Sequence, residues 1–376
     1  MKNLNLLPAI LIGGPPRSGK SVLAYSLSQA LRKRNIAHYL LRAAPDGEGD
    51  WAQEMDWERV RAIRFKGQWD EHWVRVVCRD IAARPLPLLV DVGGCPTEEQ
   101  LVIFDQCTAA IVIAPNDDDA QWWRMLVTRR GLTLVADLRS MLDGEDVFLP
   151  SAHGELRGVI CGLQRGRQAS GVVFEALVEH VARLFDLPQE ELARRQLAAA
   201  PREAHVVRFD LLARDPDLAK DQRFVEERLD AILARVPEGE PIAAYGRMPV
   251  WLVTALGARR DLRWQFDSRL GWVRTPRFAV AAPGEVLPEV QAGLRFALVR
   301  ESPQRVQLHV SRATYYLDYA EMESVRIPYV PSTARVYING PKTPAGGLPL
   351  WVFAALGRAY RYCAEVRALQ AHAQMD

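Results

Sequence analysis

Short apolar runs alternate with helix-like stretches along the first half of the chain. The apolar runs predict buried strands at 6–12, 37–42, 86–90, 109–115 and 158–162. Apolar residues recur at helical spacing at 22–31, 69–83 and 172–185. This alternation predicts an α/β fold, a doubly wound parallel sheet over residues 1–185. An Ala-, Glu- and Arg-rich helical linker is expected at 186–200.

The second half contains a sequence repeat at an offset of 100 residues. Segment 246–257 aligns with 346–357, sharing Gly, Pro, Trp, Ala, Leu and Gly. A strand-like run precedes each copy, at 241–245 and at 335–339, so each copy predicts a strand, a glycine loop and a helix opened by proline. We expect a duplicated small α/β module about a pseudo-twofold axis. The first copy covers 201–280 and a degenerate second copy covers 281–376, with Trp251 and Trp351 in equivalent buried places.

The strongest chemical signal lies between the first strand and the first helix. The pattern there is Gly, four residues, Gly, Lys, Ser, which is typical of a phosphate-binding loop (P-loop). Its backbone N–H groups can surround phosphate oxygens, with Lys20 on the β- and γ-phosphates and the Ser21 hydroxyl on Mg²⁺. We therefore predict a P-loop NTPase sheet that binds ATP and Mg²⁺, leaving the choice between adenine and guanine open. The predicted contacts are Gly14, Pro15, Pro16, Arg17, Ser18, Gly19, Lys20 and Ser21.

Acidic residues follow two of the predicted strands. Asp91 ends the strand at 86–90 and is predicted to hold Mg²⁺ together with Ser21, while Gly93 and Gly94 allow backbone approach to a γ-phosphate. A strand-end cap is the alternative interpretation of Asp91.

A second acidic group, at Asp46, Glu48 and Asp50, follows the strand at 37–42. These acids either orient a water, hold a metal or contact a second substrate, or form a solvated loop. Asp46 and Glu48 are therefore candidate catalytic residues.

Charge and cysteine content narrow the range of partners. The chain has 48 basic and 46 acidic residues, and this net charge of +2 disfavours a long nucleic acid but suits a small anion. The five cysteines show no paired or metal-ligand spacing, which indicates a reducing, cytoplasmic location. The N-terminal apolar run is too short to span a membrane, so no membrane partner is expected. We expect a homo-oligomer.

The repeat carries a family resemblance. The segments Gly246-Arg-Met-Pro-Val-Trp-Leu and Phe266-Asp-Ser-Arg-Leu-Gly271 resemble an accessory family of type III CRISPR systems, the ring nucleases. That family binds and degrades cyclic oligoadenylate, a second messenger of antiviral defence, and is known fused to an N-terminal AAA-type P-loop domain. The resemblance covers 201–276, with an echo at 291–370. It implies that Asp267 and Arg269 occupy catalytic positions, with a possible Mn²⁺ ion. The expected ligand contacts are Gly246, Arg247, Met248, Pro249, Arg259, Arg260 and Arg269.

The chain departs from the family pattern at two positions. Ala258 and Phe278 stand where the resemblance leads us to expect histidines on either side of Asp267. Arginine and backbone N–H groups bind phosphates without a metal, so we expect binding of the ring with slow or absent cleavage. A structural ion pair between Asp267 and Arg269 is the alternative.

Three functions follow from these residues. The leading one is a P-loop ATPase fused to a cyclic oligoadenylate module that regulates type III CRISPR signalling. The second is a small-molecule kinase, in which the loop at Asp46 and Glu48 seats the acceptor and the C-terminal repeat is structural. The third is a non-catalytic sponge that sequesters the ring.

Overall fold

The computed structural model describes the chain except residues 1–5, 45–69, 152, 315, 342–346 and 370–376. It divides into two compact units. The first comprises residues 1–196 and 268–270, and the second comprises 197–267 and 271–376. The boundary after Gln196 falls within the segment for which the sequence predicts a helical linker, and that segment contains helix α7 (Gln189–Ala198).

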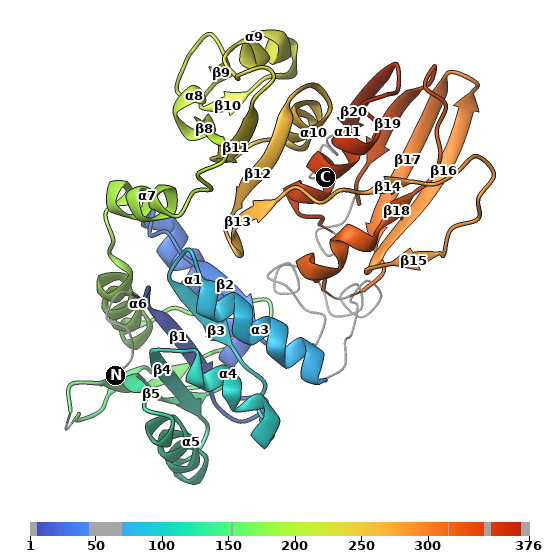
Figure 1. Ribbon diagram of the computed structural model, residues 1–376. Coiled ribbons are helices and arrows are strands. Elements are labelled where there is room, and N and C mark those ends of the chain that lie inside the picture. The colour runs from blue at the N-terminus through green and yellow to red at the C-terminus, as the bar shows by residue number, and fades with distance from the viewer. Residues whose placement is uncertain (1–5, 45–69, 152, 315, 342–346, 370–376) are drawn as a thin grey trace. The chain divides into compact units, whose positions relative to one another are not determined.

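A largely parallel sheet forms the centre of the first unit (Figure 1). Within the described residues it has seven strands in the order β2-β3-β1-β4-β5-β7-β6, and only β6 runs antiparallel to its neighbour. Strand β1 lies between β3 and β4 and is buried along its whole length, as its uninterrupted apolar sequence requires. The strands are β1 (Ala9–Gly13), β2 (Tyr39–Arg42), β3 (Leu88–Asp91), β4 (Ala109–Ala114), β5 (Thr133–Met141), β6 (Val147–Phe148) and β7 (Leu156–Cys161).

Helices cover both faces of this sheet. Ile10 and Ile12 of β1 share one core with α1 and α6. Side chains alternate along a strand, so Gly13 faces the opposite side, and there it lies against Trp123 of α5. The predicted α/β class, with helices on both faces, is confirmed. The helices are α1 (Lys20–Lys33), α3 (Glu71–Ala83), η2 (Glu98–Gln100), α4 (Val102–Asp105), α5 (Asp117–Arg129) and α6 (Val172–Phe185).

Strand β5 is absent from the sequence prediction, and its central charge explains why. Asp137 lies in the middle of β5 and is buried at 6% exposure. Its Oδ2 accepts from Arg124 Nη1 at 2.8 Å and from Arg157 Nε at 3.1 Å. These two guanidinium groups compensate a carboxylate that would otherwise be costly to bury, and they interrupt the apolar pattern by which a strand is found in sequence.

The second unit contains two larger sheets and two small ones. In its described part the sheets are ordered β13-β12-β11-β8, β15-β16-β17-β19-β20, β10-β9 and β14-β18. The elements of the first half are β8 (His205–Arg208), α8 (Phe209–Leu212), β9 (Ala219–Lys220), β10 (Arg223–Phe224), η3 (Glu226–Arg228), α9 (Leu229–Ala234), β11 (Pro241–Tyr245), α10 (Val250–Arg259), β12 (Asp261–Asp267), β13 (Gly271–Arg274) and β14 (Ala279–Val280). Those of the second half are β15 (Val290–Gln291), β16 (Leu294–Ser302), β17 (Arg305–Arg312), η4 (Tyr319–Ser324), β18 (Arg326–Ile327), β19 (Arg335–Asn339), α11 (Leu350–Ala359) and β20 (Glu365–Leu369).

The two repeat segments have the same local architecture. Each sheet contains three neighbouring parallel strands, β8-β11-β12 in one and β17-β19-β20 in the other. Helix α10 joins β11 to β12, and α11 joins β19 to β20. Pro249 and Pro349 are the N-cap residues, so each helix begins one residue after its proline. The predicted strand and helix are therefore present in both segments. The glycine loop of the second segment, at 342–346, lies outside the described residues, and the common origin of the two segments stays a prediction.

Helices α10 and α11 pack against each other through a reciprocal glycine contact. A Cβ atom on Gly257 would lie 2.2 Å from the Ala354 carbonyl oxygen, and one on Gly357 would lie 2.2 Å from the Thr254 oxygen. Each contact maps onto the other by the offset of 100 residues, which is the relation expected of a pseudo-twofold axis. Trp251 and Trp351 are both buried, at 7% and 0% exposure, as the sequence predicts.

Candidate functional site

The loop between β1 and α1 needs its two glycines for different reasons. A Cβ atom on Gly14 would lie 1.9 Å from the Ile113 carbonyl oxygen, so no side chain fits there. Gly19 adopts a left-handed conformation, with φ of 85°, and its α-carbon faces Leu163. Helix α1 begins at the next residue and has no acidic residue in its first turn. The free N–H groups of that turn are therefore suited to an anion.

Lys20 turns back over this loop. Its Nζ donates to the Pro15 carbonyl oxygen at 2.7 Å, and the side chain is largely buried. Burial lowers the pKa of Lys20. The negative charges of Asp91 and, to a smaller extent, Cys95 act to raise it. The loop thus encloses an ammonium group whose nearest loop partner is a neutral carbonyl. Such a group retains a net attraction for an anion.

Two serines of the loop lie in different environments. Ser18 is 1% exposed, and its hydroxyl has no hydrogen-bond partner in the part of the chain that the structure describes. Ser21 is half-buried at the second position of α1. The exposed loop residues are Pro16 and Arg17, and Arg17 has a left-handed φ of 64°. Ser21 is therefore the more accessible of the two hydroxyl groups.

Asp91 forms a buried ion pair that the sequence analysis missed. Asp91 ends β3, opposite Ile12 of β1 on one side and Arg42 of β2 on the other. Arg42 Nη1 lies 2.5 Å from Asp91 Oδ2, and the two side chains are 8% and 6% exposed. An arginine that ends an otherwise apolar strand was the available signal, because a buried arginine requires a compensating partner.

Neighbouring residues support the loop by close packing. A Cβ atom on Gly94 would lie 2.4 Å from the Pro16 backbone nitrogen, so Gly94 lies against the loop itself. A Cβ atom on Gly19 would lie 2.8 Å from Cβ of Leu163, beyond the end of β7. These contacts come from segments far apart in sequence and fix the loop from two sides. Asp46, Glu48 and Asp50 lie outside the described residues.

The motif of the second unit lies at the carboxyl ends of parallel strands. Gly246 follows β11 with φ of 119°, and a Cβ atom there would lie 2.5 Å from the Asp210 nitrogen. Arg247 is exposed, Met248 is buried and Pro249 caps α10. Asp267 ends β12, the neighbour of β11. Open α/β sheets bind their ligands at this edge.

The same edge carries a group of residues that the sequence analysis did not identify. Arg208 ends β8 and forms a bidentate pair with Asp210, at 2.8 and 2.6 Å. Its guanidinium carbon lies 5.3 Å from the centre of the Tyr245 ring. Tyr245 in turn packs on Phe266 and Trp272, with ring centroids 5.2 and 6.1 Å apart. These residues lie on different strands and meet only because of the strand order, so no local motif predicts the group.

The predicted arginines of the second unit do not form one cluster. Helix α10, ten residues long, separates Arg247 from Arg259 by about 15 Å along its axis. Arg260 donates to the Leu233 and Val236 carbonyl oxygens, at 2.9 and 3.3 Å. Arg269 belongs to the first unit, where its Nε lies 3.4 Å from Asp80 Oδ2. Arg247 is the member of the set that stands exposed beside the motif glycine.

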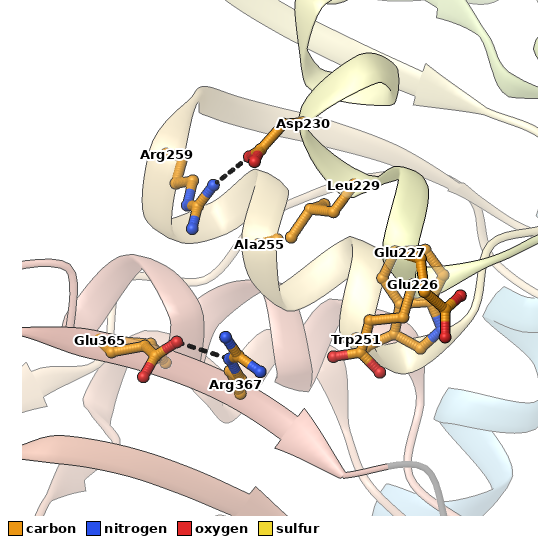
Figure 2. Close-up of a pocket in the computed structure, with 10 residues that line it drawn as sticks. Glu226, Glu227, Leu229, Asp230, Trp251, Ala255, Arg259, Glu365 and Arg367 are labelled. Carbon is orange, nitrogen blue, oxygen red and sulfur yellow. Dashed lines mark hydrogen bonds and ion pairs between the residues drawn. The ribbon is translucent and has the colours of Figure 1, made fainter. Parts of the chain in front are cut away.

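Arg259 lines a cavity of about 380 Å³ whose charge is unfavourable for phosphate (Figure 2). It pairs with Asp230 at 2.9 Å, and Arg367 pairs with Glu365 at 2.5 Å, as the dashed lines show. The lining residues carry four carboxylates and two guanidinium groups. They are Glu226, Glu227, Leu229, Asp230, Trp251, Ala255, Arg259, Glu365, Val366 and Arg367. A polyanionic ring would meet net negative charge here.

The two positions at which the resemblance predicts histidines are structural. Ala258 is half-buried in the last turn of α10. Phe278 is buried and packs edge-to-face on Phe296, with ring centroids 6.5 Å apart. Neither side chain offers a proton or a metal ligand.

A scan against protein-family models finds no match, and a search of curated proteins finds none either. Among the described residues, no helix combines the length and the apolar character that crossing a membrane would require.

Proposed function

We propose that the first unit binds a nucleoside triphosphate with Mg²⁺ and hydrolyses it. The observation that carries this proposal is the Lys20 ammonium, held over a glycine loop at the N-terminus of α1. A tight backbone at Gly14 and a left-handed Gly19 leave the loop N–H groups free of side-chain obstruction. Phosphoryl transfer is catalysed mainly by positioning and by electrostatic stabilisation, which are what such a loop supplies.

The residues present fit a nucleotide with its metal. Lys20 and the first-turn N–H groups would bind the phosphate oxygens, and the Ser21 hydroxyl and the Asp91 carboxylate would hold the ion. Mg²⁺ neutralises the charge that develops on the transferred phosphoryl group. Gly94 packs against the Pro16 backbone and the Leu163 side chain packs against Gly19, and these contacts keep the loop in place. The chain therefore supplies a pre-formed cradle, which lowers the ordering cost of binding.

Substitution of Lys20 tests this proposal. Lys20→Ala should lower ATP hydrolysis by at least about a hundredfold, because it removes the one ammonium group of the loop. Lys33→Ala, at the exposed end of the same helix, is the matched control and should hydrolyse ATP like the wild type. Release of radiolabelled γ-phosphate measures both variants. Undiminished hydrolysis in Lys20→Ala would remove the assignment, and label found on a small molecule would favour the kinase.

We propose that the second unit recognises cyclic oligoadenylate and that the protein regulates type III CRISPR antiviral signalling. The motif resemblance suggests the ligand, and the strand ends of β8, β11 and β12 provide the support. There the exposed Arg247 offers charge for phosphates, and the half-buried Phe266 and Trp272 offer rings for bases. Guanidinium and aromatic groups side by side are the usual means of holding single-stranded nucleotides.

Calorimetry with cyclic tetra- and hexa-adenylate tests the ring site. Arg247→Ala should weaken binding by about 10–100-fold, the value of one charge-assisted contact. Arg259→Ala is the control and should bind like the wild type, because Asp230 already neutralises that arginine in an acidic cavity. Absence of heat with both rings in the wild type would end this proposal.

Cleavage of the ring is a separate question with its own test. Asp267→Asn should leave ring affinity unchanged, since a carboxylate contributes no attraction for phosphate. With Ala258 and Phe278 in the histidine positions, we expect slow or no cleavage even with added Mn²⁺. Product analysis after incubation with cyclic tetra-adenylate decides between slow cleavage and sequestration.

A further inference from the structure

We propose that Arg42 is a positioning residue of the nucleotide site, whose guanidinium neutralises Asp91 until a hydrated Mg²⁺ takes its place. This inference rests on the proposed nucleotide binding of the first unit. It adds a residue and an order of events that the loop motif does not contain. Three charged side chains, Lys20, Arg42 and Asp91, are buried at this end of the sheet.

The register of the sheet places these charges together. Asp91 is opposite Arg42 of β2 and opposite Ile12 of β1, one residue before the strand ends at Gly13. The Ala43 nitrogen also donates to the Asp91 carbonyl oxygen at 2.8 Å, which fixes the end of β2 beside the end of β3. Arg42 therefore reaches Asp91 from β2, the neighbour of β3 on the side away from β1 and the phosphate loop.

Charge decides what a phosphate group meets at this edge. Lys20, Arg42 and Asp91 carry two positive charges and one negative charge. Since all three are shielded from water, their Coulomb interactions with a bound phosphate are weakly screened. A nucleotide without metal thus meets a net positive group. An uncompensated Asp91 would instead cancel the attraction of Lys20.

Arrival of Mg²⁺ gives each partner a new contact. The carboxylate exchanges the guanidinium for the water shell of the ion, which prefers carboxylate and phosphate oxygens. The guanidinium keeps its planar fork of donors, which suits phosphate oxygens in a bidentate arrangement. No charge is left buried without a partner at any point. This exchange makes nucleotide affinity only weakly dependent on Mg²⁺ in the wild type.

Fluorescence anisotropy with a mant-labelled ATP analogue, in EDTA and in saturating Mg²⁺, tests the proposal without any turnover. For the wild type, Mg²⁺ should tighten binding by less than about tenfold. Arg42→Met should weaken binding in EDTA by about 10–100-fold, the value of one charge-assisted contact, and Mg²⁺ should tighten its binding by more than about tenfold, because the ion takes over the neutralisation of Asp91. Asp91→Asn should bind more tightly than the wild type in EDTA and gain little from Mg²⁺.

Controls separate this inference from the proposed function and from loss of folding. Arg157→Met removes a guanidinium from another buried carboxylate of the same sheet, Asp137, and should leave both affinities unchanged. The double variant Arg42→Met/Asp91→Asn removes both charges and should bind in EDTA more tightly than Arg42→Met alone, even if that single variant folds poorly. Equal EDTA affinity of wild type and Arg42→Met would overturn the role of Arg42. Absence of binding in every variant and in the wild type would instead reject the nucleotide site.

Discussion

Lys20 occupies a position that disfavours its own charge. Burial lowers the pKa of this lysine below its ordinary value of 10.5, although Asp91 and Cys95 oppose the shift. The unfolded chain therefore binds the proton more tightly than the folded chain does. Stability of the ligand-free protein should rise as pH increases from the folded pKa of Lys20 towards 10.5. Below the folded pKa, the full cost of burying the charged ammonium group lowers the free energy of unfolding. A bound phosphate removes that cost, which is why a functional role fits better than a structural one.

Lys20→Met tests this reasoning at the level of stability. The ligand-free variant should melt at the same temperature as the wild type or higher at pH 7, by about 2–4 °C for each kcal/mol of penalty removed. Any such gain should shrink towards pH 10, where the wild-type lysine loses its proton. Mg·ATP should raise the melting temperature of the wild type and leave that of the variant unchanged. A clear loss of ligand-free stability in Lys20→Met would show that the ammonium is a structural group.

The candidate residues differ in how far sequence alone could identify them. The phosphate loop is local, so its glycines, Lys20 and Ser21 could be predicted from one continuous segment. The partner of Asp91 could not, because Arg42 lies 49 residues away and meets it only through the order of strands. The same holds for Arg208 and Tyr245, which neighbouring strands bring together. Non-local charge pairs depend on the order of strands in the sheet, and a local sequence pattern does not determine that order.

At the scale of elements, α10 and α11 depend on two glycines for their close approach. Gly257→Ala would gain about 1 kcal/mol from helix propensity, but its Cβ would lie 2.2 Å from a backbone oxygen. The helices would have to separate, so we expect a net loss of about 1–3 kcal/mol. Gly357→Ala should behave alike, because its contact is the reciprocal one.

Urea unfolding measures both glycine variants against one control. Ala258→Gly, the next residue along α10, changes helix propensity without adding an atom, so it should cost only about 1 kcal/mol. Equal or greater stability in both glycine variants would mean that the helix contact is loose. Loss in one variant alone would contradict the reciprocal packing.

Elements were predictable where the apolar pattern was unbroken. Strands β11 and β19 and helix α6 have the predicted ends, because β11 is a continuous apolar run, β19 alternates buried and less buried side chains, and α6 has a clear helical stripe. Strand β5 was not predicted because Asp137 lies at its centre. The two arginines that pair with Asp137 are distant in sequence, so no local pattern indicates that this charge is compensated. Strand β17 shows strict alternation, with Val306, Leu308 and Val310 buried, and that signal was present but unused.

At the scale of the whole molecule, the chain comprises two units with separate cores and separate candidate ligands. One core joins β1 with α1 and α6, and another joins β11 with α10 and the start of α11. A ligand that binds only the folded form of one unit stabilises that unit by mass action. The two proposals therefore make different demands on the same unfolding experiment.

Differential scanning calorimetry should resolve these demands. Unfolding of two units need not be two-state, so we expect two transitions or one broad one. Mg·ATP at about 100 times its Kd should stabilise the first unit by about 2.7 kcal/mol, and cyclic oligoadenylate at the same excess should do so for the second. Lys20→Ala should abolish only the ATP shift, and Arg247→Ala should reduce only the ring shift. Suppose instead that ATP shifts the same transition that the ring shifts in the wild type and that it shifts less in Arg247→Ala. The nucleotide would then not act through the P-loop unit, and the assignment of ligands to units would be wrong.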